Sequence, residues 1–211
     1  MQTDISNRDL CRVRLRFLDL LKSFFQDSPD SERLSRWRGI FAALGKEQVN
    51  LKLDTAIREL SEILSQKSLQ EIRDEHYRLF VDPYSRDLLP LTASYYIDGK
   101  SFGPSLVTLR DILKQGEIIR ERGVDDPEDT LIIMLDALIR LIQGQQDGED
   151  SNHLQEQLLQ QFLVPTVRQI KTRITATADA PFYQKCISFL DAYLDLERGL
   201  FEKQPDYTAP E

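Results

Sequence analysis

Residues 126–143 read DPEDTLIIMLDALIRLIQ, and this stretch decides between a helical fold and one that contains strands. The run LIIML could form a buried strand, but the stretch is long and begins with helix signals. Its opening Asp-Pro is typical of an N-cap followed by the first helical residue. Glu128 and Asp129 would then lie in the first turn, where the helix dipole favours negative charge. Because its apolar residues fall on more than one side, the sequence predicts a central helix over 127–143.

Helical spacing of apolar residues recurs along the rest of the chain, and no convincing alternating strand pattern interrupts it. Further helices are predicted at 7–25, 31–44, around 57–64, and at 68–80, 105–122, 154–174 and 182–201. We expect a break near Pro165, whose ring removes a helical hydrogen bond, and a stop at Gly123. The fold class is therefore all-α: a single-domain bundle of about eight or nine helices over residues 1–203, followed by a flexible tail at 204–211.

The first predicted helix has an apolar side and a charged side. Its apolar side is expected to carry Leu10, Val13, Phe17, Leu20, Leu21 and Phe24. Its charged residues fall mostly on the opposite side, and they are Arg12, Arg14, Arg16, Asp19 and Lys22. This arrangement predicts a helix that buries one face against the bundle.

The segment 81–104 is predicted to be a crossover with little helical structure. It contains three prolines, two glycines and four aromatic residues, of which three are tyrosines. A connection of about twenty residues inside a compact domain is unusual and often functional. The alternative is a plain connection whose tyrosines pack on the core.

Composition and charge narrow the function further. The 211 residues include 27 Lys and Arg against 35 Asp and Glu, a formal net charge of −8. This excess of negative charge argues against nonspecific binding to nucleic acids and against binding to an anionic membrane surface. It is compatible with a basic partner or simply with solubility. Two distant cysteines, no secretory leader and no long apolar run predict a cytoplasmic protein without disulfides.

Motifs for catalysis, metal binding and phosphate binding are missing. The chain has no glycine-rich phosphate loop, no HExxH and no GxSxG. His76 and His153 have no partner at metal-ligand spacing. We therefore predict no catalytic residue, no metal and no cofactor. A site assembled from residues distant in the sequence stays open, so a small helical enzyme is kept as an alternative.

Two stretches and their spacing carry a resemblance to a known family. The first reads EHYRLF at 75–80, then Pro83 and LPLTASYY at 89–96, and the second has Gly123 followed by DPEDT at 126–130. Together they resemble the TorD/DmsD family of cytoplasmic chaperones for molybdenum-containing redox enzymes. The resemblance covers roughly residues 10–201. Thr130 stands where that family has a histidine after the aspartate, which marks a divergence in the ligand region.

The resemblance implies a chaperone rather than an enzyme. Such a protein would bind the twin-arginine signal peptide or the apo form of a molybdopterin oxidoreductase subunit, assist cofactor insertion and delay export. An alternative is an assembly chaperone for a non-exported subunit of the nitrate-reductase type. No nucleic acid and no stable membrane insertion are expected. A monomer or a helix-swapped homo-oligomer would fit.

A twin-arginine signal is cationic and then apolar, so its binding site needs an apolar groove beside acidic groups. The expected peptide-binding residues are Tyr77, Leu79, Phe80, Pro83, Ser94, Tyr96, Asp126, Glu128 and Asp129. Core packing is the alternative for the apolar members, and a turn hydroxyl is the alternative for Ser94. Asp129 is the best single candidate, with helix capping as its rival. The site requires the 81–104 crossover to lie beside the start of the 127–143 helix.

Overall fold

The computed structural model describes residues 7–119, 123, 126–146, 149–176 and 180–201. Over those residues the chain forms helices and one isolated β-bridge but no strand, which confirms the predicted all-α class. The segment predicted as a tail, 204–211, lies outside them. The elements are α1 (Asn7–Ser23), α2 (Ser31–Leu44), α3 (Leu51–Gln66), α4 (Leu69–His76), the π-helical turn η1 (Tyr77–Val81), α5 (Ala93–Ile97), α6 (Pro104–Gln115), α7 (Leu131–Gln146), α8 (Asn152–Leu158), the π-helical turn η2 (Leu159–Leu163), α9 (Val164–Thr175) and α10 (Pro181–Gly199).

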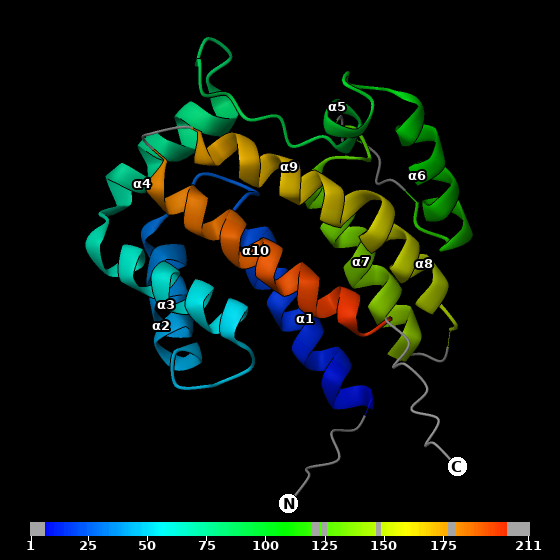
Figure 1. The fold of residues 1–211 in the computed structure, drawn as a ribbon, viewed down its shortest axis with the longest axis horizontal. Helices are drawn as coiled ribbons and strands as arrows, with labels where there is room; N and C mark the ends of the chain where they lie inside the picture. Colours follow the sequence, from blue (N-terminus) through cyan, green and yellow to red (C-terminus); the bar gives the residue numbers. More distant parts are fainter. Residues whose placement is uncertain (1–6, 120–122, 124–125, 147–148, 177–179, 202–211) are drawn as a thin grey trace, which may run out of the picture.

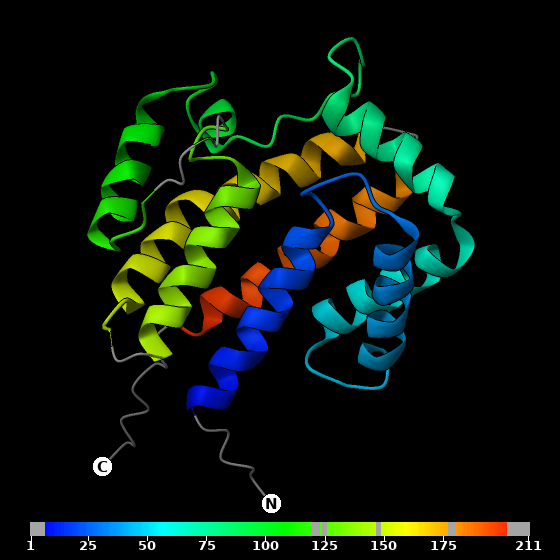
Figure 2. The same ribbon diagram turned by 180° about the vertical axis from the view of Figure 1, so that it is seen from behind.

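Helix α10 runs through the middle of the bundle and packs against α3 and α9 (Figure 1). On the other face, α1 packs against α7, and α2 packs against α3 (Figure 2). The α4–η1 end and the α5–α6 end lie on opposite sides of the molecule, joined by the crossover (Figure 1). Among the described residues, no helix is long and apolar enough to cross a membrane.

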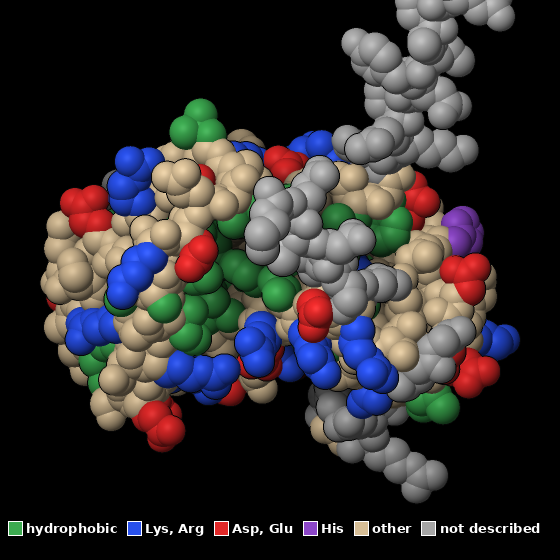
Figure 3. Space-filling model, turned by 90° about the horizontal axis from the view of Figure 1, so that it is seen from below, with side chains coloured by type: hydrophobic (Ala, Val, Ile, Leu, Met, Phe, Trp, Pro, Cys, Tyr) green, Lys and Arg blue, Asp and Glu red, His purple; other side chains and the backbone are tan. Residues whose placement is uncertain are grey.

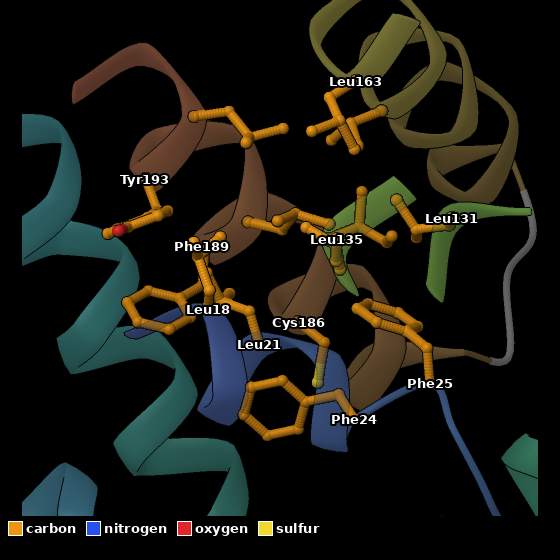
Figure 4. Close-up of a cluster of buried hydrophobic side chains, with 14 of the residues drawn as sticks. Leu18, Leu21, Phe24, Phe25, Leu131, Leu135, Leu163, Cys186, Phe189 and Tyr193 are labelled. Carbon is orange, nitrogen blue, oxygen red and sulfur yellow. The ribbon is translucent and has the colours of Figure 1, made fainter. Parts of the chain in front are cut away.

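The core gathers side chains from both ends of the sequence. Figure 4 shows side chains of α1 and the residues after it meeting those of α7 and α10. Its labelled residues are Leu18, Leu21, Phe24, Phe25, Leu131, Leu135, Leu163, Cys186, Phe189 and Tyr193. All ten are buried, so the predicted central position of α7 is confirmed.

One position of α1 departs from the predicted charged side. Arg14 is buried, and its guanidinium donates to Glu197 of α10 from Nε, at 3.0 Å from Oε2, and from Nη2, at 2.8 Å from Oε2. A further bond of 2.7 Å goes from Nη2 to Gln155 of α8. The prediction for Arg14 is wrong because a buried carboxylate, distant in sequence, supplies the partner that a buried cation needs. Val13, predicted on the apolar side, is 48% exposed.

Helix α7 begins at Leu131, four residues later than predicted. Asp126 and Pro127 are therefore not its N-cap and first residue, and the two acids that follow are not in its first turn. The backbone N–H of Leu131 instead donates to the carbonyl of Leu91 at 2.8 Å. If the helix began one turn earlier, this N–H group would donate within the helix. Because it donates to the crossover instead, the residues before Leu131 form a turn.

Two boundaries around the crossover also differ from the sequence prediction. Helix α6 ends at Gln115 and is capped by Gly116, so the predicted stop at Gly123 is wrong. A side chain at position 116 would lie 2.8 Å from Leu141 of α7, which favours glycine at this close approach. The crossover also contains the short helix α5, and five residues are too few to produce a recognisable helical period.

The break predicted near Pro165 is confirmed. The π-helical turn η2 separates α8 from α9, and Pro165 lies in the first turn of α9. Proline has no N–H to donate, and the wider turn before it accommodates the missing hydrogen bond. If α8, η2 and α9 are counted as one interrupted helix, the described residues form nine helices, as predicted.

Candidate functional site

The crossover and the start of α7 are joined by backbone hydrogen bonds. The N–H of Ala93 donates to the carbonyl of Asp129 at 2.9 Å, and the N–H of Leu131 donates to the carbonyl of Leu91 at 2.8 Å. Between them, Thr92 and Thr130 form an antiparallel bridge. The expectation that these two segments lie side by side is confirmed. We call the region where they meet the α5–α7 junction.

Asp129 lies inside this junction with no exposed surface. Its Oδ2 accepts a hydrogen bond of 2.7 Å from the backbone N–H of Ser94, at the start of α5. Its Oδ1 is buried and has no hydrogen-bond partner among the described residues. Helix capping is the alternative role predicted for Asp129, and Asp129 does cap a helix. The capped helix is α5, however, and not α7, which follows Asp129 in the sequence.

Ser94 is also fully buried and continues the chain of hydrogen bonds. Its Oγ accepts a bond of 3.1 Å from the N–H of Phe102, a residue with a left-handed φ of 59°. Such a conformation is unfavourable for a bulky residue and needs fixed surroundings. The Asp129–Ser94 contact therefore helps to hold the α5–α6 loop, whose Phe102 ring is exposed.

The tyrosines of the crossover fasten it to its neighbours. The hydroxyl of Tyr96 donates to the carbonyl of Pro90 at 2.8 Å, and burial raises the pKa of Tyr96 above its usual value. Arg173 of α9 donates to the hydroxyl of Tyr95 at 2.8 Å, and its guanidinium lies 5.6 Å from the centre of that ring. These contacts make the crossover a fixed wall of the junction.

A pocket of about 460 Å³ opens beside the junction, at the end of α6. Its lining residues are Arg110, Leu113, Lys114, Glu117, Ile118, Ile119 and Glu128. Arg110 holds Glu128 with two hydrogen bonds, Nε to Oε1 at 3.2 Å and Nη2 to Oε2 at 2.9 Å. Glu128 keeps 15% of its side chain exposed, unlike its buried neighbour Asp129. The pocket thus combines an apolar wall with two carboxylates and two cations.

Sequence reasoning included Glu128 but missed the other residues of this pocket. The apolar spacing predicts a helix over 105–122 that would include Ile118 and Ile119, whereas α6 ends before them. Ile119 is 87% exposed, which is unusual for a large aliphatic side chain. An Ile-Ile pair directly after a Gly-Glu turn was the only available signal.

Four predicted peptide-binding residues lie at the opposite end of the crossover, around η1, whereas Asp126 is exposed shortly before α7. Leu79 is fully buried, Phe80 is half-buried, and Tyr77 and Pro83 are exposed. The Phe80 ring packs edge-on against Tyr183 of α10, with ring centres 4.9 Å apart. Figure 1 shows the long path of the crossover between η1 and α5. The structure therefore divides the predicted site into two groups.

Neither histidine has surroundings that suggest catalysis. The His76 ring is buried and packs edge-on against Phe80 at 5.3 Å, and burial lowers the pKa of His76. His153 is exposed on α8, where its Nε2 lies 2.9 Å from the side-chain amide of Gln157. Both cysteines are buried and unpaired. The described part of the chain holds no group of three or more His, Cys, Asp or Glu able to bind a metal.

Known proteins are similar to this chain over most of its length. The model of the family described as nitrate reductase delta subunit matches residues 46–171, which include both groups of predicted site residues. The chain is 26% identical over 160 residues to the chaperone protein TorD of Actinobacillus succinogenes, covering 76% of this chain and 79% of that protein. It is 27% identical over 169 residues to a probable Tat proofreading chaperone, DmsD, of Haemophilus influenzae, covering 78% and 80% respectively.

Proposed function

The chain belongs to the nitrate reductase delta subunit family, and from this premise we propose that it is a cytoplasmic chaperone for the catalytic subunit of a molybdopterin oxidoreductase. It binds the client's twin-arginine signal peptide or apo form, assists cofactor insertion and delays export. It acts by reversible binding and not by catalysis. The names of the two similar proteins, a TorD chaperone and a Tat proofreading chaperone, support this role.

The observation that carries the proposal is the pocket beside the α5–α7 junction. Leu113, Ile118 and Ile119 give it an apolar wall, and the carboxylates of Glu117 and Glu128 lie at its edge beside the cations Arg110 and Lys114. A signal peptide has an apolar segment for such a wall and guanidinium groups for such carboxylates. Arginine–carboxylate pairs are bidentate and charge-assisted, as the Arg110–Glu128 contact already illustrates. Acidic groups also accelerate the encounter with a basic peptide.

The predicted site residues divide by exposure into two roles. Asp126 and Glu128 contact the arginines, and Tyr77, Phe80, Pro83 and Tyr96 offer apolar surface along the crossover. Leu79, Ser94 and Asp129 have no exposed surface in this conformation, so in our proposal they position the segments that contact the peptide. Thr130 has no imidazole, and its hydroxyl donates to the carbonyl of Pro127 at 2.7 Å, which supports the acidic turn.

Calorimetric titration of the full chain with a twin-arginine signal peptide tests this proposal. We expect binding that weakens about tenfold in Glu128→Gln, because the neutral amide loses the charge-assisted bond. Asp111→Asn, which removes an exposed carboxylate of α6 that does not line the pocket, is the matched control and should leave the affinity unchanged. Absence of binding by the folded protein, or equal losses in both variants, would count against the proposal.

The family description also supports the alternative client, a non-exported subunit of the nitrate-reductase type. Such a client has an N-terminal segment without the paired arginines. A signal peptide with both arginines replaced by lysine distinguishes the two. Lysine cannot make the bidentate contact, so weaker binding favours the exported client and unchanged binding favours the alternative.

A further inference from the structure

Helix α1 carries apolar side chains on two faces, and only one of them is fully covered. Leu18, Leu21 and Phe24 are buried in the core. Val13 and Phe17, whose spacing predicts the buried side, instead border open space, and Val13 is 48% exposed. An exposed valine alone needs no explanation. Here, however, it belongs to a continuous apolar surface that extends onto another helix.

That surface forms a groove of about 470 Å³ between α1 and α2. Its lining residues are Val13, Arg16, Phe17, Asp19, Leu20, Arg36, Ile40 and Leu44. The groove exists because the two helices pack on different partners, α1 on α7 and α2 on α3. Figure 3 looks onto the end where α1 begins and α2 ends, and shows hydrophobic side chains in a hollow with Lys and Arg along one border and single Asp or Glu side chains elsewhere around it.

The two walls have the spacing of helix-packing ridges. On α1 the apolar residues Val13, Phe17 and Leu20 follow one another at steps of four and three, and on α2 Ile40 and Leu44 are four residues apart. Helices pack by placing the side-chain ridge of one into the groove left by others. A third helix with apolar residues at the same spacing would complete this packing.

Charge at the edge of the groove selects the kind of helix. Arg16 and Arg36 line it together with Asp19, which accepts a bond of 3.2 Å from Arg36. Arg8 and Arg12 continue the α1 row at four-residue steps, with Asp9 paired to Arg12. The groove lining itself carries two arginines against one aspartate, and the row beyond it on α1 adds two arginines against one aspartate, so positive charge is in excess on a chain whose net charge is −8. An incoming helix with acidic flanks would complement this edge.

We propose that the α1–α2 groove binds an amphipathic helix of a partner protein, with an apolar stripe and acidic flanks. This surface is separate from the α5–α7 junction and prefers the opposite charge to a basic signal peptide. The inference therefore does not rest on the proposed function. It gives the protein a second binding surface for a chemically different segment.

Two synthetic helical peptides of about five turns test the proposal, both with leucines at a three- and four-residue spacing. One has glutamate flanks and the other has lysine flanks, and each is titrated against the full chain by fluorescence anisotropy. We expect the glutamate peptide to bind at least about tenfold more tightly, with a preference that falls at high salt. The double variant R16E/R36E should reverse the preference, and Val13→Asp should weaken both peptides.

Matched control variants stand on other faces of the molecule. R58E/R86E changes two exposed arginines elsewhere, and Val107→Asp changes an exposed valine on α6. These should leave the affinity of the glutamate peptide within about twofold, and circular dichroism verifies that each variant is folded. Groove variants should also leave signal-peptide binding unchanged, which keeps failure of this proposal distinct from failure of the proposed function.

Four results would overturn the proposal. The first is equal affinity for both peptides, and the second is an equal loss of binding in the control variants. The third is a chain that sedimentation shows to be a dimer and that Val13→Asp makes monomeric, because the occupant would then be a second copy. The fourth is binding of the glutamate peptide only after removal of residues 202–211, because the occupant would then be the chain's own end.

Discussion

Two buried carboxylates, one near each end of the crossover, accept backbone hydrogen bonds from helix N-termini, and they differ in how many they accept. Near η1, Glu75 of α4 accepts hydrogen bonds from the N–H groups of Phe182 and Tyr183, at 3.0 and 3.3 Å, at the start of α10. At the α5–α7 junction, Asp129 accepts a single bond from Ser94 at the start of α5. Each carboxylate caps a helix that is distant in sequence, where a helix N-terminus has unsatisfied donors.

The two capping carboxylates, Glu75 and Asp129, differ in the size and position of the helix that each one caps. Glu75 anchors α10, a nineteen-residue helix in the centre of the bundle, and Lys67 lies 3.7 Å from its Oε1. Asp129 anchors a five-residue helix at the edge, next to the candidate pocket. We infer that Glu75 serves the stability of the whole domain, and that Asp129 mainly shapes the proposed binding surface.

The largest expected effect is that of Glu75→Ala. It leaves two buried N–H groups of α10 without acceptors and should lower the free energy of unfolding by about 3 kcal/mol. Glu75→Gln keeps one acceptor oxygen at the same place and should cost less than half of that. Urea denaturation followed by circular dichroism measures both. Equal stabilities for the wild type and Glu75→Ala would show that Glu75 is no cap.

A smaller loss of stability is expected for Asp129→Ala. One acceptor disappears at the edge of the fold, so the free energy of unfolding should fall by about 1–2 kcal/mol. The affinity for a twin-arginine peptide should fall as well, because α5 and its loop lose their anchor. Asp129→Asn can still accept from Ser94 and should recover most of both. If Asn restores stability but not affinity, the charge of Asp129 itself takes part in binding.

The smallest expected effect is the pH dependence of stability, in which Glu75 and its neighbour Glu71 should differ. Hydrogen bonds from the N–H and hydroxyl of Ser68 lower the pKa of Glu71 to about 2, whereas burial raises the pKa of Glu75 above its usual 4.5. Glu71 therefore contributes stability above pH 4.5 that is lost as the pH falls toward 2. Glu75 behaves in the opposite way: its folded form retains the proton longer, so stability falls as the pH rises above 4.5.

Carboxyl chemical shifts in an NMR titration measure both groups directly. The Glu71 signal should stay that of a charged carboxylate down to the onset of acid unfolding, and the Glu75 signal should change at a higher pH than that of a free glutamate. Replacing Ser68 by Ala, which removes the side-chain part of the capping box, should return the Glu71 pKa toward 4.5 and leave Glu75 unchanged. A common pKa for the two carboxyls would contradict the assigned surroundings.

Local patterns were sufficient wherever the cause of a structure lies within one helix. The apolar spacing predicted the all-α class, the position of α10 to within two residues, and the central place of α7. Pro165 predicted the break between α8 and α9. The resemblance carried by residues 75–96 and 126–130 agreed with the family match over 46–171.

Contacts between distant segments decided the remainder. The start of α7 at Leu131 depends on Leu91, the burial of Arg14 depends on Glu197, and the role of Asp129 depends on Ser94. From local sequence alone, the start of α7 is predicted as an N-cap at Asp126, Arg14 as a solvated cation, and Asp129 as a carboxylate that binds the peptide. The amino-acid sequence determines which hydrogen-bond donors and acceptors exist, but the packing of the whole chain determines which of them meet. Only the tertiary structure could therefore assign the partners of Leu131, Arg14 and Asp129.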